Sequence, residues 1–121
     1  IYDEPIYANV DKKHYDIVVE GMWRVCEYGT GRHYKIKDVS MCGKTGTVQN
    51  NHGKDHSLFI GFAPKDDPQI AIAVVVENAG FGATWANPIA SLMIEMYLKR
   101  SIDPSRKHIE DRMVNANFIK E

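Results

Sequence analysis

The sequence of 121 residues lacks the features of several large protein classes. Its 15 basic and 16 acidic residues give a formal charge of -1, which removes the basic excess expected of a nucleic-acid binder. The longest apolar run, residues 70–76, closes at Glu77 and is far shorter than a membrane-spanning helix. Its two cysteines, Cys26 and Cys42, lack metal or redox spacing, and we expect buried free thiols. The composition therefore predicts no nucleic-acid partner, no metal and no cofactor.

The sequence also lacks the serine motifs of one class of enzymes. One class of acyl-transfer enzymes carries its nucleophile in Ser-x-x-Lys and a further site residue in Ser-x-Asn. None of the serines here has Lys three residues later or Asn two residues later; they are Ser40, Ser57, Ser91, Ser101 and Ser105. This chain is therefore not expected to form a serine acyl-enzyme by itself.

Two segments have the periodicity of amphipathic helices. Apolar residues recur at spacings of three and four across residues 11–27, and Gly29-Thr30-Gly31 follows as a stop signal. A second helix is expected over residues 87–100, with a proline in its first turn. Residues 101–121 form a charged tail, compatible with a short amphipathic helix that reaches Met113.

Three strands are predicted between these helices, over residues 39–49, 57–63 and 69–77. The linkers 50–55 and 64–68 are short and rich in turn residues, which favours antiparallel hairpins. The third strand is apolar at nearly every position, so we expect both of its faces to be covered. The pattern predicts one α+β domain with a helix, a three-stranded antiparallel sheet and a C-terminal helix.

Lys44-Thr45-Gly46-Thr47 is the most informative stretch of the sequence. Side chains alternate along a strand, so Lys44 and Gly46 share one face while both threonines share the other. Gly46 allows close approach of a ligand, and an edge strand would leave the Thr47 N–H free to stabilise an oxyanion. Taken alone, four such residues are more typical of an exposed strand with a solvated lysine and two threonines that favour β structure.

The surrounding sequence resembles the class B penicillin-binding proteins, the peptidoglycan transpeptidases of cell elongation and division, and is nearest to the elongation type. The similarity covers about residues 15–100 in order and spacing. It is carried by Gly21–Val25, Gly29–Gly31, Gly43–Gln49, His56–Pro64, Ile70–Asn78 and Ala86–Ala90.

The resemblance implies that residues 1–121 are the C-terminal part of a transpeptidase domain with a partial penicillin-binding/β-lactamase-like fold. Lys44 and Thr45 would then bind the terminal carboxylate of a D-Ala-D-Ala stem peptide or of a β-lactam. Thr47 would add its hydroxyl to that carboxylate site and its N–H to the oxyanion hole, beside Gly46.

The resemblance also implies what must lie elsewhere in a longer protein. The serine nucleophile, its lysine, the Ser-x-Asn residues and an N-terminal membrane anchor belong to other segments. The parent would sit in the bacterial cytoplasmic (inner) membrane with this domain in the periplasm. The isolated chain is expected to be inactive and to self-associate through its third strand or charged tail.

Other interpretations remain open at this stage. Cys42-Gly43-Lys44-Thr45 ends like a phosphate-binding loop, but Asp38 stands where that motif needs glycine. His52 and His56 have metal-like spacing in a turn-rich linker without enough fixed ligands. A β-lactam sensor domain, a class D-like β-lactamase or a non-catalytic module with the same sheet are the alternative functions.

Overall fold

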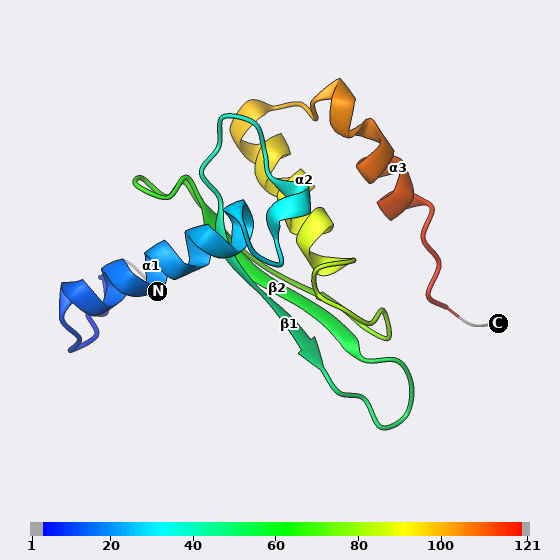
Figure 1. Cartoon of the computed structure of the whole chain (residues 1–121), viewed down its shortest axis with the longest axis horizontal. Helices are drawn as coiled ribbons and strands as arrows, with labels where there is room; N and C mark the ends of the chain where they lie inside the picture. Colours follow the sequence, from blue (N-terminus) through cyan, green and yellow to red (C-terminus); the bar gives the residue numbers. More distant parts are fainter. Residues whose placement is uncertain (1–3, 120–121) are drawn as a thin grey trace.

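The computed structural model describes residues 4–119, and its centre is an antiparallel sheet (Figure 1). The strands β1 (Cys42–Val48), β2 (His56–Ala63) and β3 (Ile70–Val76) lie in the order β1-β2-β3. The three predicted strands and both hairpins are confirmed, although β1 begins at Cys42 rather than at residue 39. The α+β class is confirmed as well.

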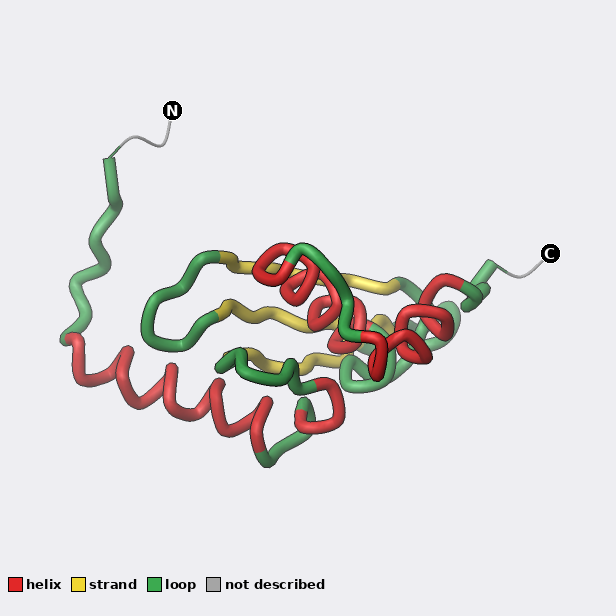
Figure 2. Tube along the Cα trace, turned by 90° about the horizontal axis from the view of Figure 1, so that it is seen from above, coloured by secondary structure: helices red, strands yellow, loops and turns green. Residues whose placement is uncertain are grey.

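Helices flank this sheet on one face and along one side. The first helix, α1 (Lys12–Glu27), packs on β1, whereas α2 (Ala86–Lys99) packs on β2 and β3. Figure 2 shows α2 lying across one face of the sheet, with α1 running along the β1 side. A short 3-10 turn, η1 (Arg32–Tyr34), follows α1. After α2 come η2 (Pro104–Arg106) and α3 (Lys107–Val114), the latter packed beside α2.

The core lies between α2 and the sheet, with the fully buried ring of Phe59 at its centre. Two glycines make room for this ring. A Cβ added at Gly43 would stand 2.1 Å from the Phe59 ring, and one at Gly61 would stand 2.7 Å from it. The other buried members of the cluster are Cys26, Ile36, Met41, Ala63, Ala86, Ala90 and Ile94. This packing fixes the start of β1 against the Phe59 ring of β2.

The prediction that both faces of β3 are covered is wrong. Burial alternates along the strand, and the side chain of Val75 is 62% exposed. The residues that point toward α2 are half-buried, whereas Ala71, Ala73 and Val75 point to the opposite face and are exposed. The apolar sequence of β3 would allow burial of both faces, but α2 covers only one of them.

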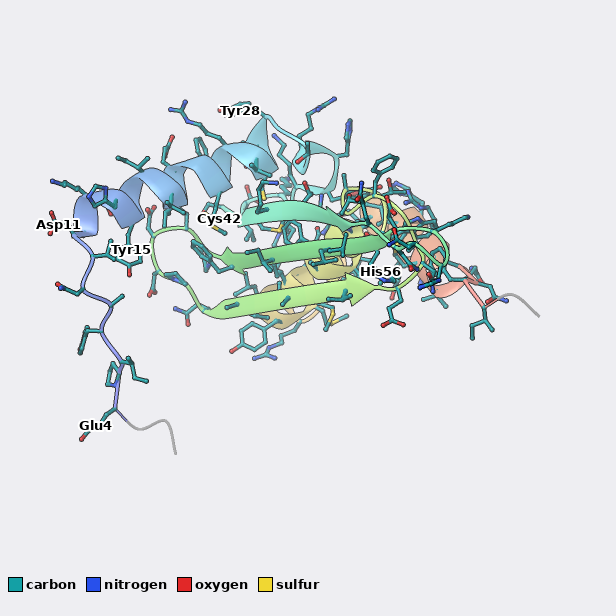
Figure 3. The ribbon with its side chains drawn as sticks, turned by 90° about the horizontal axis from the view of Figure 1, so that it is seen from below. Glu4, Asp11, Tyr15, Tyr28, Cys42 and His56 are labelled. Carbon is teal, nitrogen blue, oxygen red and sulfur yellow. The ribbon has the colours of Figure 1, made fainter. Side chains whose placement is uncertain are left out.

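The apolar stripe of α1 also contacts the sheet over less of its length than the sequence predicts. Tyr15 and Val18 are about half exposed, and burial increases toward Cys26. Figure 3 shows why, because Tyr15 lies on the part of α1, just after its N-cap Asp11, that projects beyond the strands. The stripe is real, but only its C-terminal half packs on β1.

A buried ion pair fastens the segment after α2. Glu95 is fully buried on α2, and the guanidinium of Arg106 donates hydrogen bonds to the Glu95 carboxylate and to the Ser91 hydroxyl. Asp103 caps the intervening turn by accepting the Ser105 N–H at 2.9 Å. Residues 101–114 therefore pack as ordered structure against α2.

Both cysteines are buried free thiols, as predicted. Burial raises the pKa of Cys26 to about 12 and that of Cys42 to about 11, so both stay neutral at physiological pH. None of the helices within residues 4–119 combines the length and the apolar composition needed to cross a bilayer.

Candidate functional site

The Lys-Thr-Gly-Thr motif (residues 44–47) lies on β1, which pairs only with β2 among the residues described and is therefore an edge strand. Lys44 and Thr47 are exposed, while Thr45 and Gly46 are half-buried. The Lys44 ammonium donates a hydrogen bond to the Thr45 carbonyl at 2.6 Å. The free side of an edge strand presents backbone groups that can pair with a ligand.

The strand register fixes which face each motif residue occupies. Thr45 pairs with Phe59, the residue at the centre of the core, so Thr45 and Thr47 point toward the α2 side. Lys44 pairs with Ile60, so Lys44 and Gly46 point to the opposite face. The predicted alternation is present, and the motif offers an ammonium on one side of the strand edge and two hydroxyls on the other.

A third hydroxyl lies beside the motif, and it comes from Gly29–Gly31, a segment to which the sequence analysis gave no site role. The Oγ1 atom of Thr30, in the loop after α1, lies 2.9 Å from the Oγ1 atom of Thr45. The Gly31 N–H donates to the Val25 carbonyl at 2.9 Å, and the Asn87 side-chain amide donates to the Gly31 carbonyl at 3.3 Å. This loop therefore forms a wall beside the motif.

The loop between β3 and α2 rests on the motif from the α2 side. A Cβ added at Gly82 would stand 2.3 Å from the carbonyl oxygens of both Gly46 and Leu58, so only glycine allows this approach. The Ser57 hydroxyl donates to the Phe81 carbonyl and accepts the Ala86 N–H, each at 3.0 Å. This loop is therefore bonded to β2 through Ser57.

The β1–β2 hairpin is also bonded to this loop. The Asn50 amide donates to the Asn78 side chain at 2.7 Å, and the Gly80 N–H donates to the Asp55 carbonyl at 2.7 Å. The Nδ1 atom of His56 accepts the Asn78 N–H at 3.0 Å. His56 therefore has a structural contact. Among residues 4–119, no group of three His, Cys, Asp or Glu side chains is placed to hold a metal ion, and His52 therefore belongs to no such group.

The two tryptophans lie in packing contacts. The Trp85 ring stacks edge-on with Phe118 at 4.6 Å between centroids, and the Arg112 guanidinium lies 4.9 Å from the same ring. Trp23 packs edge-on with Tyr28. The C-terminal segment thereby supports the loop that rests on the motif.

A charged cluster holds α1 to the β2–β3 turn, away from the motif. The Lys65 ammonium lies 2.7 Å from the Glu20 carboxylate and 4.6 Å from the centre of the Trp23 ring. Hydrogen bonds from Lys65 and then Arg24 lower the pKa of Glu20, and the bond to Glu20 raises the pKa of Lys65. This cluster stabilises the position of α1 beside β1.

The geometry of the motif suits an anionic ligand. An exposed ammonium, hydroxyl groups and the unpaired backbone edge of β1 are the donors that a carboxylate accepts. The two fully buried serines of the described residues are not free to attack a ligand bound at the motif. Ser57 and Ser91 are fully buried, and each hydroxyl donates to a backbone carbonyl. The motif therefore presents an ammonium and hydroxyl groups, and neither of these buried serines is available beside it.

A family model decides between the interpretations. The model described as the penicillin-binding protein transpeptidase domain matches residues 4–95, most of this chain. The chain belongs to that family. The match favours the transpeptidase over the β-lactam sensor and β-lactamase alternatives. The phosphate-loop interpretation is wrong, because Lys44 and Thr45 lie inside a strand and no helix follows them.

Relatives of known name agree with this assignment. The chain is 35% identical to the peptidoglycan D,D-transpeptidase MrdA of Acinetobacter baumannii, over 82% of the chain and 17% of that protein. It is 36% identical to the stage V sporulation protein D of Bacillus subtilis, over 69% of the chain and 15% of that protein. The predicted resemblance to the elongation-type enzymes is confirmed.

Solved structures confirm a partial transpeptidase fold. The penicillin-binding protein PBP2 of Pseudomonas aeruginosa, in complex with WCK 5153, superposes with a TM-score of 0.69 at 35% identity, over 84% of this chain and 22% of that one. Penicillin-binding protein A of Mycobacterium tuberculosis, as an imipenem acyl-enzyme, gives 0.64 at 32% identity, over 74% and 20%. The chain thus spans about a fifth of the length of these relatives.

Proposed function

We propose that this chain is part of a peptidoglycan D,D-transpeptidase of the elongation type, which cross-links stem peptides ending in D-Ala-D-Ala and is acylated by β-lactams. The family match and the MrdA relative support the activity. The imipenem acyl-enzyme of the mycobacterial relative supports the β-lactam as a ligand. The parent protein is anchored in the cytoplasmic membrane and exposes this domain on the outer side, where cell-wall precursors are cross-linked and cell shape is set.

The observation that carries the proposal is the exposure of the Lys-Thr-Gly-Thr motif along an edge strand. The Lys44 ammonium and the Thr45 and Thr47 hydroxyls bind the terminal carboxylate of the stem peptide or the β-lactam. Gly46, with no side chain, lets the ligand approach the strand. The Thr47 N–H donates to the oxyanion that forms at the attacked carbonyl.

The reaction requires a nucleophile from outside these 121 residues. The serine oxygen attacks the carbonyl carbon of the penultimate D-Ala, and the peptide bond to the terminal D-Ala breaks. The leaving amine takes a proton and departs as D-Ala. The amine of a second stem peptide then attacks the acyl-enzyme and restores the serine. In this reaction the motif holds the substrate and stabilises the oxyanion.

The test is Lys44→Ala in the whole protein. Charge-assisted hydrogen bonds contribute about 1.5–3 kcal/mol, so the second-order rate of acylation by a fluorescent penicillin should fall by about 10- to 150-fold. Lys13→Ala, an exposed lysine at the far end of α1, is the matched control. Thr47→Ala should be milder because the backbone N–H remains. A Lys44→Ala rate within twofold of wild type would contradict the carboxylate role.

For the isolated chain, we propose inactivity and self-association. Two apolar features of the described residues support this: the β3 edge that lies opposite β2, next to exposed Val75, and, on the α2 side of the sheet, the half-exposed Met93, Met96 and Tyr97. Such an edge is a template for pairing with a second copy. Light scattering at micromolar concentration should give at least a dimer; a soluble monomer would contradict this. Intact-mass spectrometry after incubation with penicillin should show no adduct.

A further inference from the structure

The contact between Thr30 and Thr45 gives the motif a partner from outside its own strand. Thr30 precedes Thr45 by 15 residues, and their Oγ1 atoms lie 2.9 Å apart, a good hydrogen-bond distance. We propose that Thr30 is a positioning residue, which orients the Thr45 hydroxyl toward the carboxylate of the ligand. This inference rests on the carboxylate-binding role proposed above for the motif.

The direction of the hydroxyl protons follows from the ligand's charge. A threonine hydroxyl donates one proton and accepts through two lone pairs, whereas a carboxylate only accepts. If Thr45 donated its proton to Thr30, only lone pairs would face the carboxylate, and the two would repel. With a carboxylate bound, Thr30 must therefore donate to Thr45, and Thr45 to the carboxylate. Donors linked in such a chain strengthen one another.

The loop that carries Thr30 is fixed tightly enough to hold this geometry. A Cβ added at Gly29 would stand 2.9 Å from the Val25 Cα, and one at Gly31 would stand 3.1 Å from the Val25 carbonyl oxygen. The fully buried Asn87 amide holds the Gly31 carbonyl from the α2 side. Thr30 is thus placed beside Thr45 before a ligand arrives, so binding needs no ordering of this loop.

Thr30→Val in the whole protein tests the proposal, because valine keeps the shape and removes the hydroxyl. The second-order rate of acylation by benzylpenicillin should fall about three- to tenfold, the usual net effect of one hydrogen bond. Thr30→Ser should restore the rate to within twofold of wild type. A loss caused only by altered packing would persist in the serine variant, which lacks the methyl group.

A double-mutant cycle with Thr45→Val shows whether Thr30 acts through Thr45. We expect Thr30→Val to slow acylation in the wild-type background and to have no further effect in the Thr45→Val background. Equal losses in both backgrounds would overturn the inference. The melting temperature of each variant is measured alongside, and Thr30→Ala replaces Thr30→Val if the valine variant does not fold.

The same experiment separates this inference from the proposed function. If Thr45→Val alone acylates at the wild-type rate, the carboxylate role of Thr45 is refuted. If Thr45→Val is slow while Thr30→Val matches wild type, the proposed function stands and the positioning role of Thr30 is refuted. Slow acylation by both single variants, without a further loss when they are combined, supports both.

Discussion

Gly82→Ala should disturb the Lys-Thr-Gly-Thr motif although Gly82 is not part of it. The added Cβ would stand 2.3 Å from two carbonyl oxygens, those of Gly46 and Leu58, and 3.0 Å from the Gly46 nitrogen. Ordinary van der Waals contact begins near 3.4 Å, so either the loop or β1 must move by about 1 Å. These neighbours are backbone atoms and cannot rotate away.

Neither movement is free of cost. Lifting the loop breaks the hydrogen bonds that the Ser57 hydroxyl makes with the Phe81 carbonyl and the Ala86 N–H, and displacing β1 moves Gly46 itself. Overpacking of this kind destabilises a protein by about 1–3 kcal/mol. Misplacing catalytic groups by about 1 Å costs up to roughly 100-fold in rate. We therefore expect a lower melting temperature together with an acylation rate reduced about 10- to 100-fold.

The assay is the acylation rate of the whole protein by a fluorescent penicillin, measured beside thermal unfolding. Gly21→Ala is the matched control, because a Cβ at that position of α1 meets no atom within 4 Å, and alanine favours a helix. It should acylate like wild type and melt no lower. If Gly82→Ala also acylates and melts like wild type, the reasoning that places this loop on the motif is refuted.

Three further predictions concern stability and reactivity. Arg106→Met should cost about 3–5 kcal/mol in urea unfolding, because the fully buried Glu95 loses its partner; unchanged stability would contradict the pair. Cys26 and Cys42, whose pKa values burial raises to about 12 and 11, should react with Ellman's reagent at pH 8 only after unfolding. The pKa of Glu20 is lower in the folded chain than its ordinary value of 4.5, so ionised Glu20 stabilises the fold at any pH above 4.5. This stabilisation is lost as the pH falls through the folded-state pKa. Glu20→Gln should therefore show a smaller loss of melting temperature in acid than wild type.

The strands and helices could be predicted because their signals are local. Turn-rich linkers separate the three strands, and the glycines after Glu27 end α1. The position of the motif on an exposed strand follows from those signals. Four residues do not identify a family, so the assignment to the transpeptidases depended on the longer resemblance around them.

The contacts that complete the site could not be predicted from local patterns. Thr30 meets Thr45, and Gly82 meets Gly46, only because α1 and α2 bring distant loops to β1. The prediction that both faces of β3 are covered failed for a related reason. A run of apolar residues does not show which other element packs on each face of the strand. The buried pair of Glu95 and Arg106 could not be predicted either, because charged residues are rarely buried.

In the proposed function, these residues form one side of an active site whose serine nucleophile belongs to another part of the protein. The most direct test is peptide mapping by mass spectrometry of the whole protein after acylation with benzylpenicillin. We expect one stoichiometric adduct, on the serine of a Ser-x-x-Lys sequence outside residues 1–121, and none within them. An adduct on any serine of this chain, buried Ser57 included, would refute the proposed function.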